Sequence, residues 1–121
     1  MTLLISRPDD VRAAQAWVDV CPLAKLVPGR GVCAKVGRLQ VAVFRVGAEE
    51  VFALSNYDPF SRSFVLSRGI IGSRGDRLKV ASPVYKQSFD LETGECLDDP
   101  SVSVPTFEAR VEAGMVQVAA P

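Results

Sequence analysis

Short apolar runs, broken by turn-forming residues about every eight to twelve positions, constrain the fold of this 121-residue chain more than any other feature. In the stretch 39–46, Leu39, Val41 and Val43 are large and apolar at alternate positions, and they are expected to face a core. A short helix is expected only at 8–16, where a proline and two acidic residues suit a first helical turn. The pattern predicts an all-β fold, an antiparallel sandwich or barrel of short strands.

Glycine-containing turns predict two of the hairpins. Gly37-Arg38 separates two apolar runs, and glycine at the first central position suits a two-residue turn. Ala113-Gly114 is expected to centre the last hairpin. The runs 31–36, 39–46 and 51–54 should form a three-stranded meander. The expected strands are 17–21, 31–36, 39–46, 51–54, 63–71 with a bend at Gly69, 78–81, 88–91, 104–112 and 115–118.

Length and charge narrow the class of protein. The chain is expected to be one domain over 1–121, with 1–16 as an N-terminal extension and 17–118 as the core. Its 14 basic and 14 acidic residues cancel, so it lacks the basic excess of a nucleic-acid-binding protein. No apolar run approaches the length of a membrane span, and no signal peptide is recognised. We therefore expect a cytoplasmic protein without nucleic-acid or membrane partners.

The side chains available for chemistry are few. The chain has no histidine, which removes the usual general base at neutral pH and the Ser-His-Asp and Cys-His nucleophile arrangements. Its three cysteines, Cys21, Cys33 and Cys96, are widely spaced and lack a CxxC motif. They are expected to be reduced and mostly buried.

Two loops are expected to lie together at one end of the sandwich. The first, 56–59, follows the apolar run 51–54, and the second, 82–86, follows the apolar run 78–81. Loops held at the end of a rigid scaffold commonly carry binding sites. These loops are therefore the candidate functional region.

Several segments resemble a known family. NYDPF at 56–60, VLSRG at 65–69 and ASPVYKQ at 81–87 resemble the small subunits of assimilatory NAD(P)H-dependent nitrite reductases. FDLETG at 89–94 is shared with true Rieske domains. The resemblance covers about residues 17–118 and implies a Rieske-like antiparallel β-sandwich.

The loops depart from the true Rieske pattern at every ligand. A Rieske domain holds its [2Fe–2S] cluster through two cysteines and two histidines, as C-x-H in one loop and C-x-x-H in the other. This chain has Asn56 and Asp58 in the first loop, and Ser82 and Tyr85 in the second. Iron–sulfur centres need thiolate or imidazole ligands, which these side chains do not supply. The chain is predicted to keep the fold without the cluster, with no catalytic, metal-binding or cofactor-binding residue.

The resemblance implies an accessory role within an oxidoreductase. A large partner subunit would bind FAD, NAD(P)H, sirohaem and a [4Fe–4S] cluster and reduce nitrite to ammonia. This chain would stabilise or align that subunit. Two alternatives stay open, a Rieske-type electron-transfer component of an oxygenase and a stand-alone β-sandwich interaction module.

Charge is segregated along the chain, which favours docking. The segment 60–88 carries six basic residues and one acidic residue, and the segment 89–112 carries seven acidic residues and one basic residue. Such segregation can orient docking on a partner, although opposite charges paired across neighbouring strands would explain it equally. Lys86, at the tip of the second loop, is the best single candidate for a partner contact. The candidate docking or loop residues are Asn56, Tyr57, Asp58, Arg62, Arg68, Ser82, Tyr85 and Lys86.

Some loop side chains have structural interpretations. The Asp58 carboxylate is suited to cap backbone amides, and the Ser82 hydroxyl is suited to bond across to the first loop in place of the cluster. Tyr57 and Tyr85 fit an interface and internal loop packing equally well. The aromatic residues expected in the core are Phe64 and Phe89.

Overall fold

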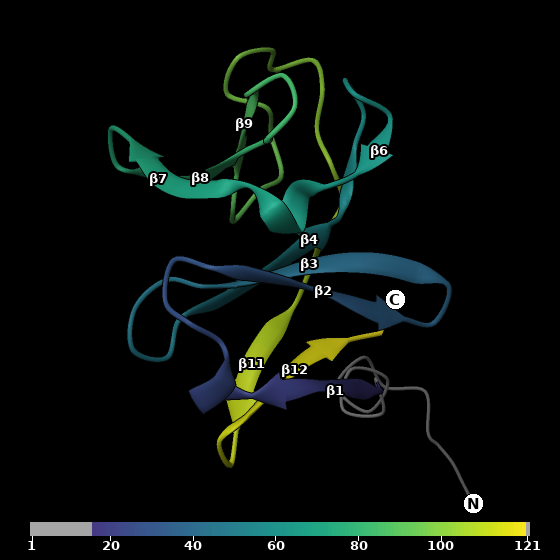
Figure 1. Ribbon diagram of the computed structural model, residues 1–121, viewed down its shortest axis with the longest axis vertical. Helices are drawn as coiled ribbons and strands as arrows, with labels where there is room; N and C mark the ends of the chain where they lie inside the picture. Colours follow the sequence, from purple (N-terminus) through teal and green to yellow (C-terminus); the bar gives the residue numbers. More distant parts are fainter. Residues whose placement is uncertain (1–15, 121) are drawn as a thin grey trace, which may run out of the picture.

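The computed structural model describes residues 16–120, which form antiparallel β-strands in three layers. Figure 1 shows the sheet β1-β12-β11 at the bottom, the sheet β10-β4-β3-β2 in the middle, and the sheet β7-β8-β9 with the β5-β6 hairpin above. The predicted all-β class is confirmed. The strands are β1 (Trp17–Pro22), β2 (Gly31–Val36), β3 (Leu39–Arg45), β4 (Val51–Ser55), β5 (Tyr57–Asp58), β6 (Ser63–Phe64), β7 (Ile70–Arg74), β8 (Arg77–Ala81), β9 (Ser88–Asp90), β10 (Thr106–Phe107), β11 (Ala109–Glu112) and β12 (Met115–Ala119).

The two hairpins expected from their turn residues are present. The β2–β3 ladder ends at the pair Val36 and Leu39, which leaves a two-residue turn in which Gly37 has a φ of 62°. In the β11–β12 turn, Ala113 and Gly114 have φ values of 52° and 79°. Positive φ at both central positions is what a type I′ hairpin turn requires, and it matches the right-handed twist of the strands. β4 pairs with β3 and completes the predicted meander.

Strand β3 is buried on both faces, which differs from the one-sided burial expected. Val41 and Val43 lie in a core cluster between the middle and lower sheets, as predicted. Ala42 and Phe44 point the other way and are equally buried, in a second cluster under the upper sheet. Leu39 is 42% exposed because it sits at the turn end of the strand. Alternation in the sequence did not reveal that a third layer covers the second face.

Arg45, the last residue of β3, joins two turns. Its guanidinium donates to the carbonyls of Leu23 at 3.1 Å and Leu26 at 3.0 Å, in the segment that follows β1. It also donates to the carbonyls of Gly47 at 3.0 Å and Ala48 at 2.7 Å, in the β3–β4 turn. One side chain therefore satisfies carbonyls from segments about twenty residues apart, which fixes both turns against the end of the middle sheet.

The strand expected at 63–71 is wrong over most of its length. Strand β6 ends at Phe64 and β7 begins at Ile70, and between them the chain forms a 3₁₀ helix at Leu66–Arg68. The cause is Asn56, whose backbone carbonyl accepts from the amide of Leu66 at 3.1 Å and whose Oδ1 accepts from the amide of Ser67 at 2.7 Å. These bonds, together with the complete burial of Leu66, hold the segment in a conformation that cannot pair as a β-strand.

The fold tests two further expectations, and a third lies almost entirely outside the described residues. The run 104–112 is two strands, because the chain leaves the middle sheet after β10 and enters the lower sheet as β11. The three cysteines are free; Cys96 is buried as expected, but Cys21 is half-buried and Cys33, on the edge strand β2, is exposed. The helix expected at 8–16 lies, apart from its last residue, outside the described residues. Within 16–120, no helix has the length and apolar character needed to cross a membrane.

Candidate functional site

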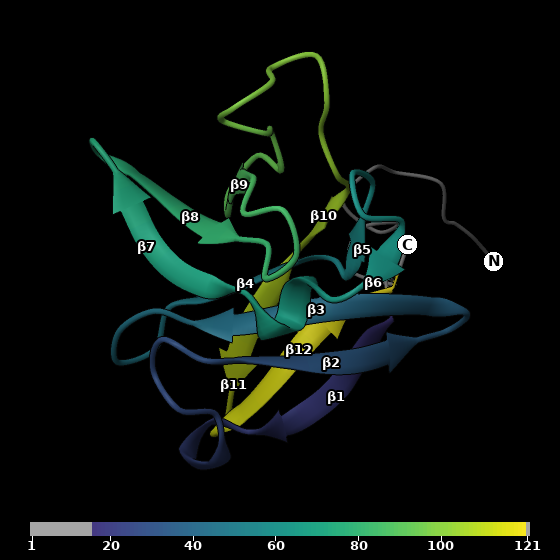
Figure 2. The same ribbon diagram turned by 45° about the horizontal axis from the view of Figure 1, so that its top comes forward.

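The two loops meet above the middle sheet. The first runs from Asn56 through the β5–β6 hairpin, and the second is the β8–β9 connection that starts at Ser82. Figure 2 shows both on the same side of β4-β3-β2, next to the 3₁₀ helix that precedes β7. The expected pairing of loops at one end of the sandwich is therefore present.

A buried hydrogen bond joins the loops. The hydroxyl of Ser82 donates to Oδ2 of Asp58 at 2.5 Å, and both residues are buried. The Ser82 oxygen also accepts from the amide of Val84 at 3.3 Å, which shapes the start of the second loop. We call the Asp58–Ser82 bond the cross-loop brace. The structural interpretation of Ser82 made from the sequence is what the geometry shows.

Asp58 organises its own loop as well. Its Oδ1 accepts from the amide of Phe60 at 2.9 Å, and its Oδ2 accepts from the hydroxyl of Ser61 at 2.9 Å. Burial acts to raise the pKa of Asp58, but the hydrogen bonds from Ser82, Phe60 and Ser61 outweigh it and hold the pKa below its ordinary value. The carboxylate is therefore charged at neutral pH and serves as the acceptor that both loops share.

Asn56 is also an internal residue. Its Nδ2 donates to Oε1 of Gln40 at 3.2 Å and to Sγ of Cys33 at 3.4 Å, and its Oδ1 holds the amide of Ser67. Only 2% of its surface is exposed. Asn56 thus ties the first loop to the β2–β3 hairpin below and to the 3₁₀ helix beside it.

The remaining sequence-predicted residues lie at the surface, apart from the half-buried Tyr57. Tyr85 is 62% exposed, and Arg62 and Lys86 are exposed with φ values of 58° and 67°. Non-glycine residues in this left-handed region cost about 1–2 kcal/mol each, so two basic side chains are held in strained positions on neighbouring loops. Arg68 is exposed too, but it lies on the 3₁₀ helix and not in either loop.

One aromatic prediction is correct and one is wrong. Phe89 is fully buried, whereas Phe64 is 53% exposed. β6 is a two-residue strand paired with β5, and the ring of Phe64 packs against that of its cross-strand partner Tyr57, with ring centroids 5.1 Å apart. Val84, in the second loop, is also 44% exposed and was missed from the sequence. The sequence feature that could have predicted its exposure is its position directly after a proline in a turn-rich segment.

Part of the charge segregation is explained by pairing between neighbouring strands. Arg77 on β8 bonds Asp90 on β9 at 2.7 Å and Glu95 at 2.9 Å. Arg74 bonds Asp98 at 3.1 Å. For these basic residues, the pairing of opposite charges between neighbouring segments therefore explains the charge segregation. Within residues 16–120, the basic side chains of the loops and the 3₁₀ helix make no ion pair; they are Arg62, Arg68 and Lys86.

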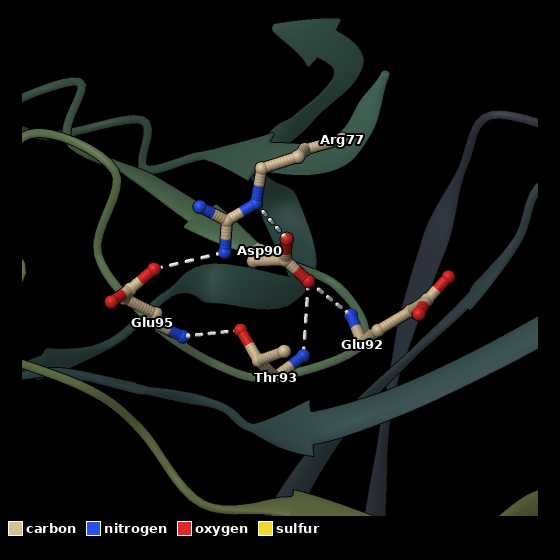
Figure 3. Close-up of polar contacts among 5 residues, drawn as sticks. All are labelled: Arg77, Asp90, Glu92, Thr93 and Glu95. Atoms are coloured by element: carbon tan, nitrogen blue, oxygen red, sulfur yellow. Dashed lines mark hydrogen bonds and ion pairs between the residues drawn. The ribbon is translucent and has the colours of Figure 1, made fainter. Parts of the chain in front are cut away.

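Figure 3 shows how the acidic partners shape the turn after β9. Oδ1 of Asp90 accepts from the amides of Glu92 at 2.7 Å and Thr93 at 2.9 Å, while Arg77 holds the other carboxylate oxygen. Burial acts to raise the pKa of Asp90, but these hydrogen bonds outweigh it, and the pKa lies below its ordinary value. Asp90 is thus a structural residue that fixes the turn after β9.

Comparison with known proteins identifies a matching family and several relatives. Residues 16–119 match the Rieske-like [2Fe-2S] domain. The chain is 48% identical over 103 residues to the nitrite reductase (NADH) small subunit of Escherichia coli K12, covering 84% of this chain and 95% of that one. The NMR structure of the E. coli protein NirD has a TM-score of 0.82 and 47% identity, covering 88% of this chain and 97% of that chain.

A third relative is a much longer chain. The nitrite reductase [NAD(P)H] large subunit of Klebsiella oxytoca is 37% identical over 105 residues, which are 87% of this chain and 11% of that one. A segment similar to almost all of this chain is therefore part of a single large-subunit polypeptide in that protein.

The residues between the loops do not fit the [2Fe–2S] cluster that the family description names. The groups gathered there are the Asp58 carboxylate, the Ser82 hydroxyl and the Asn56 amide, and each is already engaged in hydrogen bonds. The thiol of Cys96 is in the core cluster under the upper sheet, while Cys33 lies on the edge strand β2. Within 16–120 no group of three or more histidine, cysteine, aspartate or glutamate residues is placed to hold a metal ion. Thiolate or imidazole ligands are required, and the loops offer neither.

Proposed function

This chain belongs to the Rieske-like domain family, among the small subunits of NADH nitrite reductase, and we propose that it acts as an accessory subunit without a cluster of its own. Its enzyme is an oxidoreductase. The chemistry from nitrite to ammonia, with FAD, NAD(P)H, sirohaem and a [4Fe–4S] cluster, is assigned in this proposal to a large partner subunit. The role of this chain is to stabilise that subunit or align it for electron flow.

The cross-loop brace is the observation that carries the proposal. A Rieske scaffold that transfers electrons holds iron between these loops, but here Asp58 and Ser82 bond each other at 2.5 Å in a buried position. No residue of this pair exchanges electrons under physiological conditions. What the brace provides is a rigid pair of loops whose outer surface is presented in one arrangement. That is the property of a docking element, since a preformed surface loses little conformational entropy on binding.

The partner is proposed to be the large subunit. In support, the Klebsiella relative carries a segment similar to this chain within its own large-subunit polypeptide. Two domains that work in one polypeptide in one protein commonly work as an attached pair when they are encoded separately. The attachment proposed here would be non-covalent.

The exposed part of the two loops is the proposed contact face. Tyr85 and Phe64 supply exposed aromatic surface, and Arg62 and Lys86 supply positive charge without an ion pair in the described part of the chain. Aromatic side chains and arginine are enriched at the centres of protein interfaces, and a lysine beside them can orient docking through its charge. Asn56, Asp58 and Ser82, which are buried, would contribute by holding these residues in place.

Co-expression with the large subunit tests the proposal. The two chains are expected to co-purify, and nitrite-dependent NADH oxidation is expected to fall when this chain is omitted. Tyr85→Ala and Lys86→Glu should weaken the complex, whereas Lys35→Glu, an exposed lysine on β2, serves as the matched control. The proposal is wrong if the chains do not associate, or if activity and stability of the large subunit are the same without this chain.

Iron and acid-labile sulfide assays of the isolated chain test the absence of a cluster. No stoichiometric iron is expected, because the loops lack thiolate and imidazole ligands. Stoichiometric iron with the visible absorption of an oxidised cluster would favour the oxygenase-type electron carrier instead. Specific capture of an unrelated protein, with no affinity for the large subunit, would favour a stand-alone interaction module.

A further inference from the structure

We propose that a basic groove beside the two loops binds an acidic segment of the large subunit that also carries an apolar side chain. The groove has a volume of about 430 Å³ and lies between the start of β2, at 29–31, and the segment 67–70. The inference rests on the proposed function for the identity of the partner, and it adds a second contact with a stated chemistry. We call this surface the Arg30–Arg68 groove.

Its charge is positive and is not neutralised nearby. Arg30 and Arg68 both line the groove and both are exposed. Neither makes an ion pair within residues 16–120, and no carboxylate lines the groove. By contrast, Arg74 and Arg77, farther along the same upper sheet, are paired with acidic residues. Guanidinium groups that face one groove without internal partners complement carboxylates on another chain.

The groove also offers an apolar contact at one end. Ile70 lines it and is 70% exposed, more than any other large apolar residue in the described part of the chain. It opens β7, which is the edge strand of the β7-β8-β9 sheet. An apolar side chain flanked by unpaired basic residues complements a segment that carries both an apolar side chain and carboxylates. A free inorganic anion would leave Ile70 exposed.

The walls of the groove are rigid. A Cβ atom on Gly31 would lie 2.4 Å from the ring of Phe44 and 2.7 Å from the carbonyl oxygen of Ser67, so β2 and the 3₁₀ helix are in direct contact there. A Cβ atom on Gly69 would lie 2.5 Å from the carbonyl oxygen of Ala81. These contacts fix the backbones that carry the two arginines. The site is therefore preformed, and binding does not have to order the walls.

Arg68 is among the docking residues predicted from the sequence, whereas Arg30 and Ile70 are not. Arg30 lies in the connection before β2, far along the chain from Arg68, and only the packing of Gly31 against the 3₁₀ helix brings the two together. No local pattern marks that contact.

Charge reversal in the full chain tests the inference. The double variant Arg30→Glu/Arg68→Glu is titrated against the purified large subunit by calorimetry at low and high salt. We expect its Kd to be at least about 10-fold weaker than that of the native chain, because like charges would face each other across the interface. The native affinity should fall more steeply with salt than that of the variant. Arg38→Glu, at an exposed position in the β2–β3 turn, is the matched control and should change Kd by less than about 2-fold.

The apolar contact is tested separately. Ile70→Ala is expected to weaken binding by about 3- to 10-fold, as for an interface side chain of moderate contribution. Leu39→Ala, another exposed apolar residue at a strand end, should have no such effect. Thermal unfolding of each variant checks the fold. If the charge-reversed chain is unfolded, the milder pair Arg30→Gln/Arg68→Gln replaces it, with a loss of at least about 3-fold expected.

The outcomes separate this inference from the proposed function. If the native chain binds the large subunit and the folded double variant binds equally well, the groove is not a contact, although the accessory role stands. The same holds if Arg38→Glu weakens binding as much as the double variant, since the effect would then be one of net charge. If the native chain does not bind the large subunit, both proposals fail. If the double variant instead abolishes a dimer of this chain, the occupant is a second copy and the inference is overturned.

Discussion

Removing the cross-loop brace provides the sharpest test of how the loops are held. Ser82→Ala deletes the hydroxyl that donates to Asp58 at 2.5 Å and accepts from Val84 at 3.3 Å. A hydrogen bond to an ionised group contributes about 1.5–3 kcal/mol, and burial of both partners prevents water from replacing it. We expect the free energy of unfolding at pH 7 to fall by about 2–3 kcal/mol. At about 4 °C per kcal/mol, Tm should fall by about 8–12 °C.

The pH dependence gives this prediction a second signature. The folded-state pKa of Asp58 lies below the ordinary value of 3.8, so its contribution to stability is present above 3.8 and is lost as the pH falls through the folded-state pKa. Ser82→Ala removes one of the bonds that lower this pKa. The difference in stability between the native chain and the variant should therefore be largest at neutral pH and shrink below pH 3.8.

Urea unfolding at several pH values measures both effects. Ser101→Ala is the matched control, because its hydroxyl also bonds a carboxylate, that of Asp99 at 2.6 Å, but in an exposed position. It should cost less than about 0.5 kcal/mol. A loss for Ser82→Ala as small as that of the control, or a loss that does not shrink between pH 7 and the lowest pH at which both chains are still folded, would refute the reasoning. The loops would then be held by their backbone contacts and not by the brace.

Three further predictions concern the scaffold. Arg45→Met should lower the free energy of unfolding by about 2–4 kcal/mol in urea, because it removes the guanidinium that donates to four backbone carbonyls, of which that of Leu23 still accepts from the amide of Leu26; a loss near zero would mean that water replaces the guanidinium. Gly69→Ala should lower the free energy of unfolding by at least about 2 kcal/mol, because the new Cβ would lie 2.5 Å from a carbonyl oxygen. Gly72→Ala is the control, since the nearest atom to its Cβ would be 3.7 Å away. Equal Tm values for the two variants would contradict the packing. Arg77→Met should raise the pKa of Asp90 in an NMR titration, because the arginine is one of the groups that lower it; an unchanged pKa would show that the backbone amides alone set it.

Much of the scaffold follows from local sequence. Short apolar runs separated by glycine-containing turns predicted the meander and the last hairpin, and the left-handed φ values at Gly37 and Gly114 show why glycine stands there. The missing cluster ligands were also readable, because ligand chemistry depends on residue type and not on packing. The brace was one of two sequence interpretations of Ser82, and the structure decides between them.

The errors share one cause. The strand predicted at 63–71 has apolar residues suited to a ladder, but Asn56 captures the backbone of the segment, and the two are about ten residues apart. Phe64 was placed in the core because it is aromatic, yet it lies in the short β5–β6 ribbon with 53% of its surface exposed. Strand β3 was predicted to have one buried face, because the alternation of large apolar residues marks one face as apolar and does not indicate whether another layer covers the other face. In each case the structure depends on a contact with a part of the chain that lies outside the local sequence window.

What the sequence determined by itself is the class of fold and the set of side chains available for chemistry, since strand periodicity, turn residues and ligand types are properties of single residues and their near neighbours. Only the tertiary structure decided which charges pair and which remain available. Arg77 is neutralised by Asp90 and Glu95 because β8 and β9 lie side by side, whereas Arg30 and Arg68 face one groove without a carboxylate between them. The physical reason is that a charge acts through space, over distances that the order of residues along the chain does not specify.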